Sequence, residues 1–156
     1  MSRQDRDIFS DTPPAADTRR QIAALCWRMH GSAPEVLLIT SRDTGRWIIP
    51  KGWLIDGLTE AEAATREAWE EAGVEGRAEP APLGVFTYRK GLSSQKTVPC
   101  AVQVFALRVE GLAISYPEKG QRKRKWLPLG KAAKKVQEPE LRHLILTFAP
   151  SVAVKG

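Results

Sequence analysis

The stretch of sequence that decides the fold is residues 52–74, GWLIDGLTEAEAATREAWEEAGV. Thr59 and Glu62 have the spacing of a capping box, in which each side chain accepts a hydrogen bond from the other residue's backbone N–H. The alanines that follow favour a helix, and Gly73 supplies a C-terminal stop. The sequence therefore predicts a helix between Thr59 and Gly73, preceded by a glycine-containing loop over residues 51–58.

Three glutamates of this helix, Glu67, Glu70 and Glu71, lie within about 100° of one another around the helix axis, while alanines form the core-facing stripe. Like charges within one turn repel each other. Hard divalent cations with oxygen ligands offset such repulsion, and magnesium commonly shares its ligands between carboxylates and substrate phosphates. Taken alone, the pattern fits either a metal site or a solvated acidic face.

Apolar segments on both sides of this helix predict a sheet. We expect strands at 20–28, 36–40, 47–49, 83–88, 98–109 and 124–127, and closing helices at 129–137 and 139–148. A mixed α/β fold with the sheet between helices is the natural packing of these elements. Residues 1–17 are polar and aperiodic, which predicts a flexible N-terminal tail before a single domain over residues 18–156.

The composition is that of an ordinary globular protein, with 42% hydrophobic and 27% charged residues. No apolar run approaches the roughly 20 residues that span a membrane, and the N-terminus lacks the apolar stretch of a secretory signal. Cys26 and Cys100 are expected to be buried free thiols, with a disulfide as the alternative. We therefore expect a cytoplasmic protein. The net charge of +6 suits a polyanionic ligand bound beside the acidic helix, although improved solubility is the alternative explanation.

Residues 52–74 resemble the signature of the Nudix hydrolases. That signature is Gly, five residues, Glu, seven residues, Arg-Glu, an apolar residue, any residue, Glu-Glu, any residue, Gly and an apolar residue. The residues at matching positions are Gly52, Arg66, Glu67, Ala68, Glu70, Glu71, Gly73 and Val74. Leu58 stands where the signature has its first glutamate, and Asp56 or Glu60 could substitute for it, with Arg66 leaning on Glu62.

The resemblance extends over roughly residues 18–150. The segments RRQIAALCWR, SRDTGRWIIPKG and GQRKRKWLPL resemble the diphosphoinositol polyphosphate and diadenosine polyphosphate hydrolase branch of the family. This resemblance implies a Nudix-type α/β/α sandwich and metal-dependent hydrolysis of a phosphoanhydride bond, with Mg²⁺ or Mn²⁺ as the cofactor. Metal ions in such a site activate a water molecule and stabilise the leaving phosphate, and a carboxylate takes the proton.

The site residues follow from the same resemblance. The implied catalytic set is Glu67, Glu70, Glu71 and Arg66, and the implied metal ligands are the three glutamates and the backbone carbonyl of Lys51. Glu118 is a further candidate ligand, with a plain surface role as the alternative. Which glutamate acts as the general base stays open.

Basic residues at strand ends and in loops are candidates for contacts with phosphate, because sites are usually built there. The expected substrate contacts are Arg20, Arg42, Arg46, Arg89, Lys51 and Gly52, and Arg19, Lys90 and Lys96 are further basic residues of this kind. Arg20 and Arg42 fall where the branch places its basic substrate contacts. For each of these residues, a plain surface charge is the alternative. Trp47 and Trp53 flank the loop, and each is expected either to stack on a base of the substrate or to pack within the fold.

The expected substrate is a diadenosine polyphosphate or a diphosphoinositol polyphosphate. The alternatives are an RNA 5′-pyrophosphohydrolase, a nucleoside triphosphate pyrophosphatase and a non-catalytic nucleotide-binding module; the three glutamates argue against the last. The basic run at 119–125 (KGQRKRK) fits nucleic acid loosely, but a partly exposed strand edge is the favoured interpretation. We expect no membrane partner, and either a monomer or a homodimer.

Overall fold

The computed structural model describes residues 17–150, so the expected tail at 1–17 lies outside the described residues except for Asp17. At its centre is a seven-stranded sheet in which β3, β2, β1, β6 and β5 are neighbours in that order, while β4 pairs with β1 and β7 with β2. The strands are β1 (Arg19–His30), β2 (Ala33–Thr40), β3 (Trp47–Ile48), β4 (Lys51–Trp53), β5 (Val74–Ser93), β6 (Lys96–Leu112) and β7 (Arg124–Pro128). Because β1 runs parallel to β6 and the other pairs are antiparallel, the sheet is mixed, as expected.

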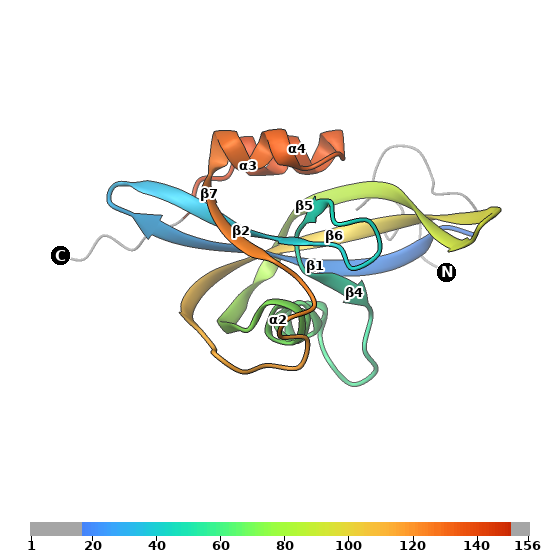
Figure 1. Cartoon of the computed structure of the whole chain (residues 1–156), viewed down its shortest axis with the longest axis horizontal. Coiled ribbons are helices and arrows are strands. Elements are labelled where there is room, and N and C mark those ends of the chain that lie inside the picture. Colours follow the sequence, from blue (N-terminus) through green and yellow to red (C-terminus); the bar gives the residue numbers. More distant parts are fainter. Residues whose placement is uncertain (1–16, 151–156) are drawn as a thin grey trace.

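Helices cover both faces of the sheet. They are α2 (Glu60–Ala72), α3 (Leu129–Lys135) and α4 (Pro139–Leu146), with α2 on one face and the other two on the opposite face (Figure 1). On the α2 side, the small side chains of Ala64, Ala68 and Ala72 are fully buried, which lets the helix approach the sheet closely. On the other side, Leu141 and Ile145 of α4 complete a second core. The predicted α/β/α sandwich is confirmed.

Two observed strands differ most from the elements that the sequence predicts. β4 lies inside the segment expected to be a loop, because its three residues become a strand only by pairing with Gln21–Ala23 of β1. β5 begins at Val74 rather than at residue 83. Its first half lacks an apolar alternation, and its register shifts on both sides of Pro82, which cannot donate to the strand ladder.

Two further expectations concern the chain as a whole. Cys26 and Cys100 are buried free thiols, as expected. Among residues 17–150, no helix is long and apolar enough to cross a membrane.

Candidate active site

The position of α2 is fixed at both ends. The capping box is present, with the backbone N–H of Thr59 donating to Glu62 Oε1 (2.8 Å) and that of Glu62 donating to Thr59 Oγ1 (3.1 Å). At the other end Gly73 adopts a left-handed conformation (φ 68°), and a Cβ placed on it would lie 2.5 Å from the ring of Tyr116. The helix therefore begins and ends as the sequence predicts, and this sets which of its side chains face β4.

Gly52 of β4 lies directly against the carboxylate of Glu67. A Cβ placed on Gly52 would lie 2.4 Å from the carboxyl carbon of Glu67, which is closer than a Cβ approaches a non-bonded atom. One residue earlier, the backbone N–H of Lys51 donates to Glu71 Oε1 (3.2 Å). The backbone of β4 and two carboxylates of α2 thus form one packed unit, in which glycine is the residue that fits.

Glu71 is buried and Glu67 is half-buried. Glu71 is only 6% exposed, and burial, together with the adjacent Glu67, raises its pKa from 4.5 to about 8. Burial also raises the pKa of Glu67, as do the negative charges of Glu70 and Glu118, although a hydrogen bond with Glu71 acts in the opposite direction. Two adjacent acids with raised pKa values that line a pocket are typical of a functional site.

Arg122 is the nearest cation to these acids, and it is not among the site residues that the sequence predicts. Its Nε donates to Glu118 Oε1 (3.0 Å), its Nη1 donates to the carbonyl oxygen of Thr40 (3.1 Å), and its Nη2 lies 3.9 Å from Glu71 Oε1. The side chain is only 8% exposed. Arg122 belongs to the basic run 119–125. Nothing in the sequence of this run distinguishes the one arginine that points into the pocket from its exposed neighbours.

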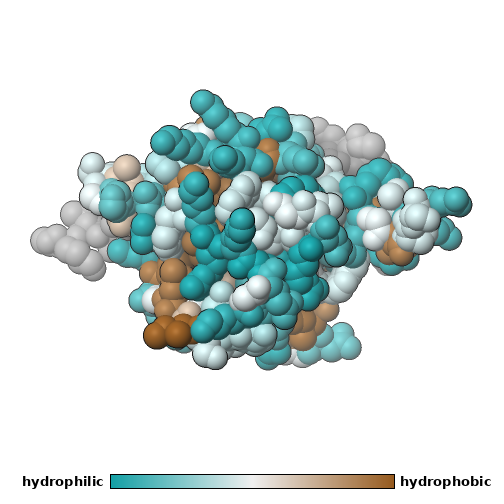
Figure 2. Space-filling view, in the orientation of Figure 1, coloured by the Kyte–Doolittle hydropathy of each residue, from teal (hydrophilic) through white to brown (hydrophobic). Residues whose placement is uncertain are grey.

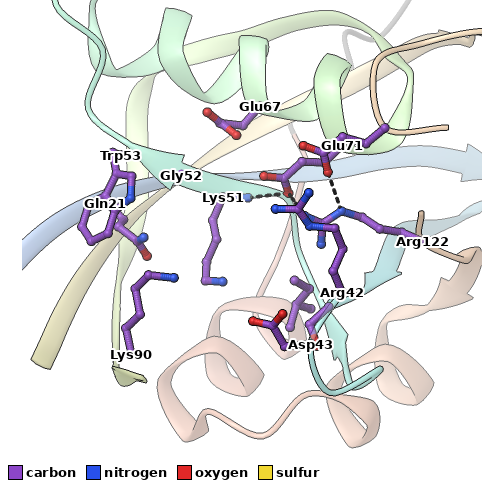
Figure 3. A pocket seen from close by; sticks show the side chains of 13 residues that line it. Gln21, Arg42, Asp43, Lys51, Gly52, Trp53, Glu67, Glu71, Lys90 and Arg122 are labelled. Carbon is purple, nitrogen blue, oxygen red and sulfur yellow. Dashed lines mark hydrogen bonds and ion pairs between the residues drawn. The ribbon is translucent and has the colours of Figure 1, made fainter. Parts of the chain in front are cut away.

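These groups line a pocket of about 300 Å³ that also contains Gln21, Ser41, Asp43, Ile48 and Trp53. Figure 3 shows Glu67 and Glu71 on the α2 side of β4, and Lys51 and Lys90 on the other side of that strand. Arg42 also lines the pocket and donates to Gln121 Oε1 (3.0 Å). Two glutamates therefore lie on one side of β4 and two lysines on the other, and Arg122 and Asp43 line the same pocket.

Three cations that line the pocket make no short contact with a carboxylate of the described residues. Among residues 17–150, Arg42, Lys51 and Lys90 form no ion pair. The ammonium group of Lys51 lies 4.9 Å from the centre of the Tyr88 ring, and that of Lys90 lies 5.8 Å from the centre of the Trp53 ring. Such cations provide charge for an anionic ligand.

Several expected site residues lie elsewhere. Glu70 does not line the pocket; its carbonyl accepts a hydrogen bond from the N–H of Glu118 (3.0 Å). Three of the expected substrate contacts are engaged outside the pocket. Arg20 pairs with Glu60 (2.9 Å), Arg46 pairs with Glu138 (3.0 Å), and Arg89 donates to Thr97 Oγ1 (2.9 Å).

The region around Leu58 shows what replaces the missing signature glutamate. Glu60 pairs with Arg20 and accepts a hydrogen bond from Gln103. Among the described residues, Arg66 forms no ion pair with Glu62 or with any other carboxylate. Instead, the N–H of Leu58 donates to the carbonyl oxygen of Ile55 (3.1 Å). The loop is therefore closed by its own backbone and by the capping box rather than by an arginine–glutamate pair.

The donor groups fit a hard divalent cation, although not as a preformed cluster. Within residues 17–150, no three His, Cys, Asp or Glu side chains are gathered closely enough to hold a metal ion. Glu67 and Glu71 are oxygen donors that share one wall of the pocket, and Glu118 lines the same pocket. The raised pKa values show that the charged forms of these two acids are disfavoured without a cation, and a bound divalent cation would favour them.

Comparisons with known proteins identify the family of this chain. The model of the NUDIX domain family matches residues 18–148. Nudix hydrolase 13, mitochondrial, from Arabidopsis thaliana is 34% identical over 127 residues, covering 78% of this chain and 63% of that protein. Diphosphoinositol polyphosphate phosphohydrolase 3-alpha from Mus musculus is 31% identical over 121 residues, covering 76% of this chain and 70% of that protein.

A solved structure shares the fold. The crystal structure of the C. elegans Ap4A hydrolase superposes with a TM-score of 0.59 at 21% identity, covering 83% of this chain and 94% of that one. The chain spans 50–66% of the length of four Arabidopsis thaliana relatives that it matches. With a family model that matches residues 18–148 and relatives of this similarity, the chain belongs to the Nudix family.

Proposed function

We propose that this protein hydrolyses a phosphoanhydride bond in a nucleoside or inositol polyphosphate, with Mg²⁺ or Mn²⁺ as its cofactor. The observation that carries the proposal is the division of the pocket by β4, with Glu67 and Glu71 on one side and Lys51 and Lys90 on the other (Figure 3). A polyphosphate bound to metal through one part and to ammonium groups through another matches both sides.

Glu67 and Glu71 would hold the metal, with Glu70, Glu118 and the carbonyl of Lys51 as further candidate ligands. Bound there, the metal supplies Lewis acidity toward phosphate oxygens and an activated water. The chain's own residues supply the orientation. The Lys51 N–H holds one oxygen of Glu71 (3.2 Å), and contact with Gly52 fixes Glu67, so both carboxylates are positioned before a ligand enters.

The charges of the pocket support the proposed substrate class. Arg42, Lys51 and Lys90 all line the pocket without a carboxylate partner in residues 17–150, which favours a substrate with several phosphates. The names of two relatives, a diphosphoinositol polyphosphate phosphohydrolase and an Ap4A hydrolase, support the same class. We propose a diadenosine polyphosphate or a diphosphoinositol polyphosphate as the substrate. A cytoplasmic location and a monomeric or dimeric state stay predictions.

A panel of substrates tests this function. Purified protein with Mg²⁺ is incubated with diadenosine polyphosphates, diphosphoinositol phosphates, nucleoside triphosphates and 5′-triphosphorylated RNA, and phosphate products are measured. Glu71→Gln should lower kcat by more than about a hundredfold on the preferred substrate, since even groups behind the metal ligands contribute 10–100-fold. The control is Glu110→Gln, an exposed acid outside this pocket. Tight binding without cleavage of any compound would instead favour a non-catalytic module.

A further inference from the structure

Gln21 is a buried polar residue of the candidate active site to which the hydrolysis proposed above assigns no role. It lies on β1, lines the pocket and is only 4% exposed. Figure 2 shows hydrophilic residues over much of the visible surface of the molecule, and polar groups on a surface are ordinary, whereas buried ones are informative. A buried amide is costly unless its polar atoms are hydrogen-bonded, so the partners of Gln21 indicate its function.

Only one end of the Gln21 amide has a partner within the described residues. The Tyr88 hydroxyl donates to Gln21 Oε1 (2.7 Å), and no group of residues 17–150 accepts a hydrogen bond from Gln21 Nε2. The oxygen of a side-chain amide accepts hydrogen bonds and its nitrogen donates two. Because Tyr88 occupies the oxygen, the donor end of the amide is available to a ligand in the pocket.

Tyr88, Gln21 and Lys51 lie on one face of the sheet. Ala23 of β1 lies opposite Lys51 of β4 in the ladder. Because alternate residues of a strand share a face, Gln21 and Lys51 share the face on which Ala23 packs into the core beside α3 and α4, and Tyr88 packs against that same core. Figure 3 shows Gln21 and Lys51 on the side of β4 away from Glu67.

Tyr88 does not line the pocket itself, but it contacts two residues that do. Besides the bond from its hydroxyl to Gln21, the centre of its ring lies 4.9 Å from Lys51 Nζ. The face of an aromatic ring attracts a cation, and Lys51 forms no ion pair within residues 17–150. One tyrosine, anchored by the core, therefore holds a neutral donor and a cation at the same side of the pocket.

A neutral N–H donor next to an ammonium group suits the oxygens of a phosphate, because hydrogen bonds to an ionised acceptor are stronger than those between neutral groups. We propose that Tyr88 is a positioning residue for the phosphates of the substrate. It orients the Gln21 amide through its hydroxyl and the Lys51 ammonium group through its ring, and these two groups contact phosphate oxygens. The inference rests on the polyphosphate hydrolysis proposed above.

The first test is isothermal titration calorimetry with inorganic tripolyphosphate in EDTA, so that neither a metal ion nor turnover contributes. Gln21→Ala should raise Kd about ten- to hundredfold, because it removes a hydrogen bond to a charged group. Tyr88→Phe keeps the ring and removes the hydroxyl, and it should raise Kd about three- to tenfold. The double variant should bind as Gln21→Ala alone does, because the hydroxyl acts through Gln21.

Two further substitutions separate positioning from packing. Gln21→Glu keeps an acceptor for the Tyr88 hydroxyl but replaces the amide donor with an anionic oxygen, so it should weaken binding at least as much as Gln21→Ala. Tyr88→Leu also removes the ring beside Lys51, and it should raise Kd about two- to fivefold beyond Tyr88→Phe.

Kinetics on the preferred polyphosphate provide the second measurement. Tyr88→Phe should raise KM by the same factor as Kd and change kcat by less than about twofold, because the contact is made in the ground state and the transition state alike. The matched control is Tyr116→Phe, which removes the hydroxyl of the other tyrosine of the chain, outside the pocket. It should leave Kd and KM unchanged. Thermal melting shows that each variant folds.

The proposal is overturned if the wild type does not bind tripolyphosphate, or if Tyr88→Phe binds it as the wild type does. It is also overturned if the effects of Tyr88→Phe and Gln21→Ala add in the double variant, or if Gln21→Glu binds normally. If binding follows the expected pattern while no polyphosphate is cleaved, the positioning of phosphate by Tyr88 holds and the proposed hydrolysis fails.

Discussion

At the edge of the candidate active site, the Glu67 carboxylate occupies the space that a side chain at position 52 would need. An alanine at position 52 would bring its Cβ within 2.4 Å of the Glu67 carboxyl carbon, so the carboxylate has to move. Displacement of a catalytic group by about 1 Å costs about a hundredfold in rate. We therefore expect Gly52→Ala to lower kcat/KM by about that factor while the thermal midpoint changes little.

Gly91→Ala is the matched control for this substitution. Gly91 also lies in a strand, but a Cβ placed there meets nothing within 4 Å. The activity of the Gly91→Ala variant should equal that of the wild type. Full activity of Gly52→Ala would show that the position of Glu67 against β4 does not matter for turnover.

Glu71 makes the stability of the metal-free protein depend on pH. Its pKa in the folded chain is about 8, against an ordinary value of 4.5, so the folded state binds this proton more tightly than the unfolded state. Its contribution to stability is therefore fully present below about pH 4.5 and is lost as the pH rises toward 8. In EDTA, the thermal midpoint of the wild type should fall over this range relative to that of Glu71→Gln.

The same measurement with Mg²⁺ provides the internal comparison. Metal binds the deprotonated carboxylates, so Mg²⁺ should raise the wild-type midpoint most at pH 8 and leave that of Glu71→Gln nearly unchanged. Parallel pH profiles of the two proteins in EDTA would contradict the assignment of a raised pKa to Glu71.

The sequence could predict some of these residues but not others. Glu67 and Glu71 are set by helical spacing, which is local information, and both line the pocket. Arg122 reaches the pocket only because it donates to Thr40, 82 positions away. The predicted substrate contact at Arg20 stays a prediction. In the structure Arg20 pairs with Glu60, and this pair could not be deduced before β1 and α2 were placed side by side.

At the scale of elements, the capping box stabilises the first turn of α2. Thr59→Ala removes the side-chain acceptor of the Glu62 N–H (3.1 Å), and loss of such a cap costs about 1 kcal/mol. We expect the thermal midpoint to fall by about 2–4 °C for a chain of this size, as measured by circular dichroism. Thr59→Ser keeps the hydroxyl and should behave as the wild type; an equal loss in both variants would assign the effect to packing of the threonine methyl group.

The same helix shows why some elements are visible in a sequence and others are not. Both ends of α2 are encoded within a few residues of the helix, by Thr59 with Glu62 and by Gly73. β4 is encoded by its partner instead, because three residues pair with Gln21–Ala23 and have no pattern of their own. A strand of that length is therefore assigned only once β1 is in position.

At the scale of the whole molecule, two hydrophobic cores share one sheet. In β1, Ile22, Ala24 and Cys26 face the α2 side, whereas Ala23 and Leu25 face the α3 and α4 side. The strand alternation thus links the two cores through the same backbone. Loss of packing on the α4 side should therefore also unfold the candidate active site on the other face.

A pair of substitutions on α4 tests this linkage. Ile145 is fully buried and Leu146 is 59% exposed, although they are neighbours on the same helix. Ile145→Ala should cost about 2–5 kcal/mol through the cavity it leaves, whereas Leu146→Ala should change the free energy of unfolding by less than about 0.5 kcal/mol. Urea unfolding of Ile145→Ala, followed by tryptophan fluorescence and by residual hydrolysis, should give one midpoint for both signals because the cores share their strands. If hydrolysis persists to a higher urea concentration than the fluorescence transition, the α2 side folds independently and the shared sheet does not couple the two cores.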